Sequence, residues 1–278
     1  MIFVGPAGNA SMAREPGTEG SLKWLAENGL NAQEIEFVRN IYLKPERAEA
    51  IGKLAKQLGI RLSVHAPYFI NFASESKAVI DASKRMLFDS ADRAERLGAD
   101  AIAVHIAYYA KQREKTAELV KHNLLEVLDK MKKAGIKNVK IGIEVMAKPN
   151  QFPTLDECIA FCADIKHAQV VPYIDWAHIF CYKGSIDYAE IFEKLKPLKL
   201  SHINSHFSNM KYDARKKSYV DIHQMIDKAP DFVPLAQEIL KRKCSITIIA
   251  ESKPWPDKDA LKIKEILEKY GKKPLAKL

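Results

Sequence analysis

The sequence repeats one alternation eight times: a short run of β-branched and other apolar residues, then a longer segment with the 3.6-residue apolar spacing of a helix. The strand-like runs cover residues 2–7, 32–38, 61–67, 101–107, 140–146, 170–178, 199–207 and 245–252. A strand, a helix and another strand indicate a parallel pair with a crossover connection. Eight such units predict an α/β fold of the (β/α)8 TIM-barrel class.

A predicted helix follows every strand-like run. These helices cover residues 21–29, 45–59, 76–98, 113–135, 154–165, 187–196, 232–243 and 257–271. Gly29, Gly59, Gly98 and Gly135 end four of them, where a left-handed C-cap suits glycine. Because 278 residues suit one barrel and no linker or low-complexity stretch divides the chain, we expect a single domain over residues 1–278.

Composition excludes several classes of protein. With 47% hydrophobic and 28% charged residues, the chain is neither disordered nor fibrous. It shows no signal-peptide pattern and no apolar run near the roughly 18 residues of a membrane span, so we expect neither secretion nor membrane insertion. Four cysteines without a C-x-x-C pair indicate a reduced, cytoplasmic protein. Cys158 and Cys162 have the spacing of core residues on one helix face, which we favour over metal ligation.

The chain is basic, with 44 Lys and Arg against 35 Asp and Glu and a net charge of +9. This charge suits a polyanionic partner, but solvated lysine-rich helices such as 110–135 produce it equally well. No G-x-G-x-x-G motif or P-loop opens a helix, so we expect no nucleotide cofactor.

Six of the eight predicted strands carry a histidine or a carboxylate near their C-terminal ends. These residues are His65, His105, Glu144, Asp175, His178, His206 and Glu251. In a TIM barrel these strand ends face the side that holds the active site. Each residue alone could be a hydrogen-bonded core histidine, a helix cap or an ion-pair partner. Converging carboxylates, however, need cations to neutralise them, and imidazole and carboxylate ligands without thiolate suit zinc, manganese or iron.

A D-x-H pair, Asp221 and His223, lies in the segment after the seventh predicted strand. Two residues apart in an extended chain, their side chains point the same way and can chelate one metal ion. The motif alone is weak because it recurs by chance.

Together these motifs resemble endonuclease IV, a family of metal-dependent apurinic/apyrimidinic endonucleases within the xylose-isomerase-like barrels. The resemblance lies in HAPYFIN (65–71), VHIA (104–107), GIEVM (142–146), IDWAH (174–178), SHFSNMK (205–211), VDIH (220–223) and AES (250–252). It implies a DNA-repair hydrolase that cleaves the phosphodiester 5′ to an abasic site in double-stranded DNA. It also implies three zinc ions per chain, with manganese or iron as alternatives. The segment after Glu144 and the sequence DWAH at Asp175 differ from those of well-known members of the family. The details of the DNA-contacting loops therefore stay open.

The resemblance assigns nine residues to the three zinc ions. The first ion would have His65, His105 and Glu144, the second Glu144, Asp175, His206 and Glu251, and the third His178, Asp221 and His223. Glu144 would thus bridge two ions and would also be the catalytic base or orienting residue. Tyr68 and Asn71 would line the pocket or contact the DNA backbone, although Tyr68 could equally pack beneath the rim.

Basic residues between the proposed ligands provide candidate phosphate contacts. They are Lys211, Arg215, Lys216 and Lys217. We favour phosphate contact over a merely solvated rim, because these residues lie between proposed metal ligands. His202 and His206 compete for one ligand role on the seventh strand. The sequence SHFSNMK resembles the family segment and favours His206 as the ligand. His202 lies four residues earlier on the strand, deep inside the barrel, and is expected to be an interior hydrogen-bonding residue.

Two other function classes remain open. A sugar isomerase or epimerase of the same barrel group would explain four or five of the nine ligands, but not the group His178, Asp221 and His223, nor the basic charge. A non-catalytic phosphate-binding or DNA-binding module would leave costly converging carboxylates unused.

Overall fold

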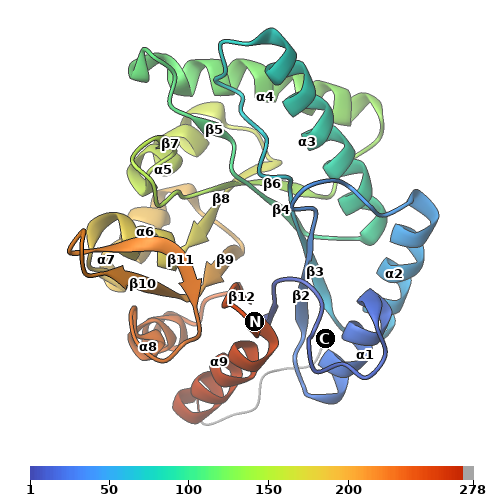
Figure 1. Ribbon diagram of the computed structural model, residues 1–278. Helices are drawn as coiled ribbons and strands as arrows, with labels where there is room; N and C mark the ends of the chain where they lie inside the picture. Colours follow the sequence, from blue (N-terminus) through green and yellow to red (C-terminus); the bar gives the residue numbers. More distant parts are fainter. Residues whose placement is uncertain (272–278) are drawn as a thin grey trace. The chain divides into compact units, whose positions relative to one another are not determined.

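The computed structural model describes residues 1–271, whose helices and strands are drawn in Figure 1. These residues fall into two compact units. The first unit comprises Met1–Glu34, Leu54–Arg61 and the chain from Ile174 onward, and the second comprises Ile35–Lys53 and Leu62–Tyr173. The expectation of a single domain over 1–278 stays a prediction, and its last seven residues, 272–278, lie outside the described chain.

Eight parallel strands alternate with helices, which confirms the predicted α/β TIM-barrel class. The strands are β1 (Ile2–Pro6), β2 (Ala32–Glu36), β3 (Arg61–His65), β4 (Ala101–Val104), β6 (Lys140–Glu144), β8 (Val170–Asp175), β9 (Ile203–Phe207) and β12 (Ile246–Ala250). The helices are α1 (Gly17–Glu27), α2 (Pro45–Gln57), α3 (Lys77–Leu97), α4 (Thr116–Lys133), α5 (Leu155–Ile165), α6 (Trp176–Lys183), α7 (Tyr188–Leu195), α8 (Phe232–Arg242) and α9 (Pro256–Gly271). Most strand residues are buried, as is usual in parallel sheets, and they form the core.

In the first unit, β12 pairs in parallel with both β1 and β9. His206 lies opposite Ile249 in this ladder, and Glu251 directly follows the last paired residue of β12. A parallel bridge between Ala7 and Glu34 continues the pairing beyond β1. The ladder therefore brings polar residues from several strand ends to one edge of the sheet.

In the second unit, β4 pairs with β3 and β6, and β6 pairs with β8. Gly142 lets β6 pack closely, because a Cβ there would lie 2.6 Å from the Tyr173 ring and 2.9 Å from the Ile102 carbonyl oxygen. Glu144 ends the same strand two residues later. The glycine thus permits the close packing that fixes the position of this carboxylate.

Each of the eight predicted strands was longer than the observed strand, by one to four residues at an end, and two of these differences have a local cause. The strand expected over 170–178 stops at Asp175, because the Asp175 carboxylate accepts a hydrogen bond from the His178 N–H and starts α6. The strand expected over 199–207 begins only at Ile203, since a 3-10 turn over Lys196–Leu198 precedes Lys199 in a left-handed conformation. The predicted C-cap glycines are confirmed, each with a positive φ between 64° and 77°.

The sequence prediction missed four further strands that form two small antiparallel ladders. One ladder joins β5 (Ala107–Tyr108) and β7 (Gln151–Phe152). The other is a hairpin of β10 (Asn209–Asp213) and β11 (Ser218–Gln224), and it carries the D-x-H pair that we expected in a loop. Cys158 and Cys162 are buried on α5, as predicted for core residues. Within residues 1–271, no helix combines the length and apolar character needed to cross a bilayer.

Candidate metal centres

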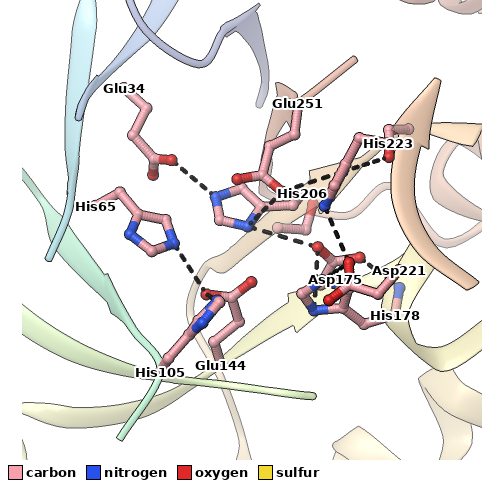
Figure 2. A network of polar contacts seen from close by, with 12 residues as sticks. Glu34, His65, His105, Glu144, Asp175, His178, His206, Asp221, His223 and Glu251 are labelled. Atoms are coloured by element: carbon pink, nitrogen blue, oxygen red, sulfur yellow. Dashed lines mark hydrogen bonds and ion pairs between the residues drawn. The ribbon is translucent and has the colours of Figure 1, made fainter. Parts of the chain in front are cut away.

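The second unit brings together His65, His105 and Glu144 at the ends of β3, β4 and β6 (Figure 2). The Glu144 Oε2 atom lies 3.3 Å from the His65 Nε2 atom and 3.2 Å from the His105 Nε2 atom. The three potential ligand atoms all lie within 4.8 Å of one another. Two imidazoles and one carboxylate around such a small volume make a suitable donor set for zinc.

The His65 ring is held by the backbone beside it. Its Nδ1 atom lies 2.8 Å from the Ala66 carbonyl oxygen, which only accepts, so Nδ1–H donates and Nε2 faces Glu144. Tyr68 packs on this group, with its ring centroid 4.9 Å from those of both His65 and His105. Because 37% of Tyr68 remains exposed, it both packs against the histidines and borders solvent.

The other predicted substrate residue of this loop has an internal role. The Asn71 Oδ1 atom accepts hydrogen bonds from the backbone N–H groups of Ala73 and Tyr108. These contacts fix the loop after β3. A contact of Asn71 with substrate stays a prediction.

The first unit brings together Asp175, His206 and Glu251 at the ends of β8, β9 and β12. The His206 Nδ1 atom lies 3.4 Å from the Glu251 Oε2 atom and 3.8 Å from the Asp175 Oδ2 atom. The Asp175 and His206 side chains are fully buried, and Glu251 is nearly so. Two carboxylates and one imidazole therefore converge away from bulk water.

A second group in the same unit consists of His178, Asp221 and His223, whose potential ligand atoms lie within 4.8 Å of one another. The Asp221 Oδ1 atom is 3.5 Å from the Nε2 atom of each histidine. His178 is placed by the N-terminus of α6, and the other two residues lie two apart on β11. Asp221 and His223 both place a potential ligand atom within 4.8 Å of one on His178. This agrees with the same-side geometry predicted for the D-x-H pair.

Packing against α6 holds the hairpin. Phe180 and Met210 belong to one buried cluster, and the Tyr219 ring packs on Phe180 with centroids 4.4 Å apart. Asn209, at the base of the hairpin, accepts hydrogen bonds from the N–H groups of Asp227 and Lys228 and donates to the Pro230 carbonyl. These contacts position β11 so that its polar residues face His178.

The electrostatics of His223 reflect this acidic setting. Burial lowers its pKa, but the hydrogen bond to Asp221 and the charge of Glu251 outweigh burial, so the pKa lies above its ordinary value. Its Nδ1 atom lies 2.8 Å from the Ser208 hydroxyl oxygen. The surrounding negative charge favours a bound cation or a protonated ring.

His202 belongs to none of these three groups. Its Nδ1 and Nε2 atoms lie 2.9 and 2.8 Å from the hydroxyl oxygens of Ser245 and Thr247. Burial, then the charge of Arg61, lower its pKa to about 3. The expectation that His202 is an interior hydrogen-bonding residue is confirmed, while His206 lies among the ligand-type residues.

The four predicted phosphate-binding residues lie together, exposed, on the hairpin that carries Asp221 and His223. They are Lys211, Arg215, Lys216 and Lys217. Asp213 shapes the turn by accepting hydrogen bonds from the N–H groups of Arg215 and Lys216. Phosphate contact by these side chains stays a prediction.

Glu34 on β2 is a buried carboxylate of the first unit that was not predicted from the sequence, and it contacts a predicted ligand. Its Oε1 atom lies 2.9 Å from the His206 Nε2 atom, and its side chain is fully buried. The available signal was a glutamate inside the strand-like run AQEIE. A charged residue in an otherwise buried strand requires a partner.

Comparison with known proteins places the chain in a family. Residues 22–271 match the model described as the xylose isomerase-like TIM barrel. The chain is 26% identical over 198 residues to an uncharacterized protein of Methanocaldococcus jannaschii, covering 68% of this chain and 70% of that one. It is 37% identical over 70 residues to a probable endonuclease 4 of Streptomyces avermitilis, covering 24% of this chain and 23% of that one.

Solved structures of two activity classes are similar to this chain. A D-tagatose 3-epimerase-like protein has a TM-score of 0.72 and 22% identity, over 97% of both chains. Endonuclease IV from Thermus thermophilus has a TM-score of 0.70 and 19% identity, over 95% of this chain and 98% of that one. At these identities the likenesses establish the fold alone.

Proposed function

We propose that this chain, which belongs to the xylose isomerase-like TIM barrel family, is a zinc-dependent apurinic/apyrimidinic endonuclease. It would hydrolyse the phosphodiester 5′ to an abasic site in double-stranded DNA, in base-excision repair. The observation that carries the proposal is the group His178, Asp221 and His223, whose ligand atoms lie within 4.8 Å of one another. An isomerase of this barrel group, which binds one or two metal ions, has no need of this additional group. The local identity to a probable endonuclease 4 supports the same activity.

The donor sets fit the expected metal. Both units present imidazole and carboxylate ligands without thiolate, in buried or largely buried positions. His65, His105 and Glu144 would hold zinc in the second unit, and the two groups of the first unit would hold zinc there. The bridging role of Glu144 that the resemblance implies stays a prediction.

The protein's own residues would then serve phosphodiester hydrolysis. When bound, zinc supplies Lewis-acid polarisation of a phosphoryl oxygen. The Glu144 carboxylate would orient the attacking water and accept its proton. Attack on phosphorus breaks the bond to the 3′ oxygen, which leaves as a 3′-hydroxyl group after protonation. Tyr68 would border the abasic sugar, and Lys211 and Arg215 would contact backbone phosphates.

A metal-dependent sugar isomerase or epimerase is the second candidate. The observation in its favour is the fold, which matches an epimerase-like structure as closely as an endonuclease IV structure. Asp175, His206 and Glu251 are also the residue types that such enzymes use at strand ends. The hairpin group and the four exposed basic residues would have no assigned role in that reaction.

Two parallel assays distinguish these candidates. The zinc-loaded protein is incubated with a duplex that contains one abasic-site analogue, with the same duplex lacking it, and with a panel of ketoses. The proposal predicts a single nick on the 5′ side of the analogue and no change in the sugars. Glu144→Gln is the control against a contaminating nuclease and should nick far more slowly than the wild type. Ketose turnover with intact abasic DNA would refute the endonuclease proposal.

A further inference from the structure

Two sides of the His206 ring meet carboxylates in the first unit, as Figure 2 shows. The Nε2 atom lies 2.9 Å from the Glu34 Oε1 atom, at hydrogen-bond distance. The Nδ1 atom faces Glu251 at 3.4 Å and Asp175 at 3.8 Å. Glu34 and His206 are both fully buried. The contact to Glu34 is therefore the short one, and it leaves the opposite nitrogen directed at the ligand-type carboxylates.

The chemistry of this contact determines which nitrogen can bind a metal ion. An ionised carboxylate only accepts hydrogen bonds, so the Nε2–H group of His206 donates to Glu34. In the neutral ring the lone pair is then on Nδ1, toward Asp175 and Glu251. Metal-binding histidines commonly donate their other N–H to a carboxylate in this way, which fixes the tautomer and makes the ligand more basic.

We propose that Glu34 is a positioning residue that holds His206 with Nδ1 directed at zinc and so tightens zinc binding by Asp175, His206 and Glu251. This inference rests on the proposed zinc binding of the first unit but not on cleavage of DNA. Glu34 would touch neither zinc nor substrate. It would act through the ring of His206.

Two of the other proposed ligands contact neutral groups through their second ring nitrogen. A third, His178, has its Nδ1 atom 3.4 Å from Asp175, which is itself a proposed ligand. The His65 Nδ1 atom donates to the neutral carbonyl of Ala66, and the His223 Nδ1 atom pairs with the neutral hydroxyl of Ser208. Glu34 instead provides a carboxylate in a fully buried position. A buried carboxylate is costly unless it is paired, so its presence here needs a compensating interaction, which a cation-binding imidazole provides.

If Glu34 had a purely structural role, a different result would be expected, and the neighbouring residue Gln33 provides the control. Gln33 is equally buried on β2, but it accepts a hydrogen bond from Ser21 and donates one to Asn9. Gln33→Ala therefore disturbs the same strand without touching His206. If Glu34 only supported the strand, both substitutions would affect zinc binding alike.

The first measurement is zinc affinity, by competition with a chromogenic chelator on the full-length protein, with folding checked by circular dichroism. Glu34→Ala should weaken one class of zinc site by about 10–100-fold, the usual cost of losing such a partner. Glu34→Gln should weaken it less, because the amide oxygen still accepts the Nε2–H bond. Gln33→Ala should bind as the wild type does. Equal affinities of Glu34→Ala and Gln33→Ala would overturn the inference.

The second measurement reads the ring itself, by long-range ¹H–¹⁵N NMR of the zinc-loaded protein with labelled histidine. The His206 signals should show a protonated Nε2 and a zinc-shifted Nδ1 in the wild type and in Glu34→Gln, but not in Glu34→Ala. If Glu34→Ala does not fold, Glu34→Gln decides, and an unchanged affinity there would overturn the inference. A wild type that binds no zinc would refute the proposed centre and this inference together, whereas zinc binding without incision would refute only the endonuclease.

Discussion

The group His65, His105 and Glu144 in the second unit and the group His178, Asp221 and His223 in the first unit use the same ligand chemistry on different frameworks. The former lies at the ends of three parallel strands. The latter takes two of its three residues from an antiparallel hairpin, where the Asp221 and His223 side chains are 12% and 17% exposed. The barrel class supplies the first framework, while an added element supplies the second. The hairpin group is therefore the better guide to the specific activity.

The largest expected effect concerns the strand-end group. Glu144→Gln should lower abasic-site incision by roughly 10²–10⁴-fold, because it removes the proposed base and one ligand charge. Single-turnover kinetics on an abasic duplex measure the change, and an unchanged unfolding transition shows that the fold is kept. Incision at the wild-type rate would remove Glu144 from the catalytic residues.

The hairpin group should respond separately. Replacing Asp221 with Asn and His223 with Ala should remove about one zinc ion per chain, since both proposed ligands of that group on β11 are lost. The control is Ile222→Ala, which changes an exposed side chain between them on the same strand. Atomic absorption of the purified variants gives the zinc content. Full zinc in the double variant would contradict the role of the hairpin.

The exposed basic side chains of the hairpin should affect affinity rather than chemistry. Neutralising Lys211, Arg215, Lys216 and Lys217 together should weaken binding to all DNA sequences alike. It should also flatten the plot of log K against log salt concentration by roughly 0.9 per lost phosphate contact. Fluorescence anisotropy at several salt concentrations tests this, and an unchanged slope would show that these residues are only solvated.

The smallest effect concerns His202, which neither group includes. Its pKa is about 3 in the folded protein against 6.5 ordinarily, so as pH falls below 6.5 only the unfolded chain takes up the proton. This residue therefore makes the free energy of unfolding fall with falling pH, down to about pH 3. His202→Asn should flatten that dependence and leave zinc content unchanged. The free energy of unfolding of both proteins is measured with urea at several pH values. If the assignment is wrong, it will fall in parallel for the wild type and His202→Asn as the pH falls.

Sequence reasoning recovered the strand-end residues because a strand end in a β/α repeat has a defined side of the sheet. It missed Glu34, since period-2 alternation places Glu34 and Glu36 of AQEIE on one face but cannot tell whether that face meets solvent or a buried partner. It extended the sixth strand through WAH because those residues suit a strand, while the capping bond from His178 N–H to Asp175 depends on the fold. The local sequence pattern thus located the ligand-type residues themselves better than the residues that hydrogen-bond to them.

The hairpin was missed for a different reason. Its turn, between Asp213 and Ser218, lacks the Asn-Gly or Asp-Gly pair that usually indicates a two-residue hairpin. Lys217 adopts a φ of 52° there, a conformation that glycine or asparagine takes more readily. Packing of Tyr219 on Phe180 stabilises the hairpin, and that contact joins elements that sequence alone does not pair.

The zinc content of the purified full-length protein tests the central claim most directly. After saturation with zinc and removal of excess by gel filtration, metal analysis should give about three ions per chain, one for each of the three ligand groups described above. A content of one or two ions, unchanged by the Asp221 and His223 substitutions, would contradict the account and favour the isomerase class.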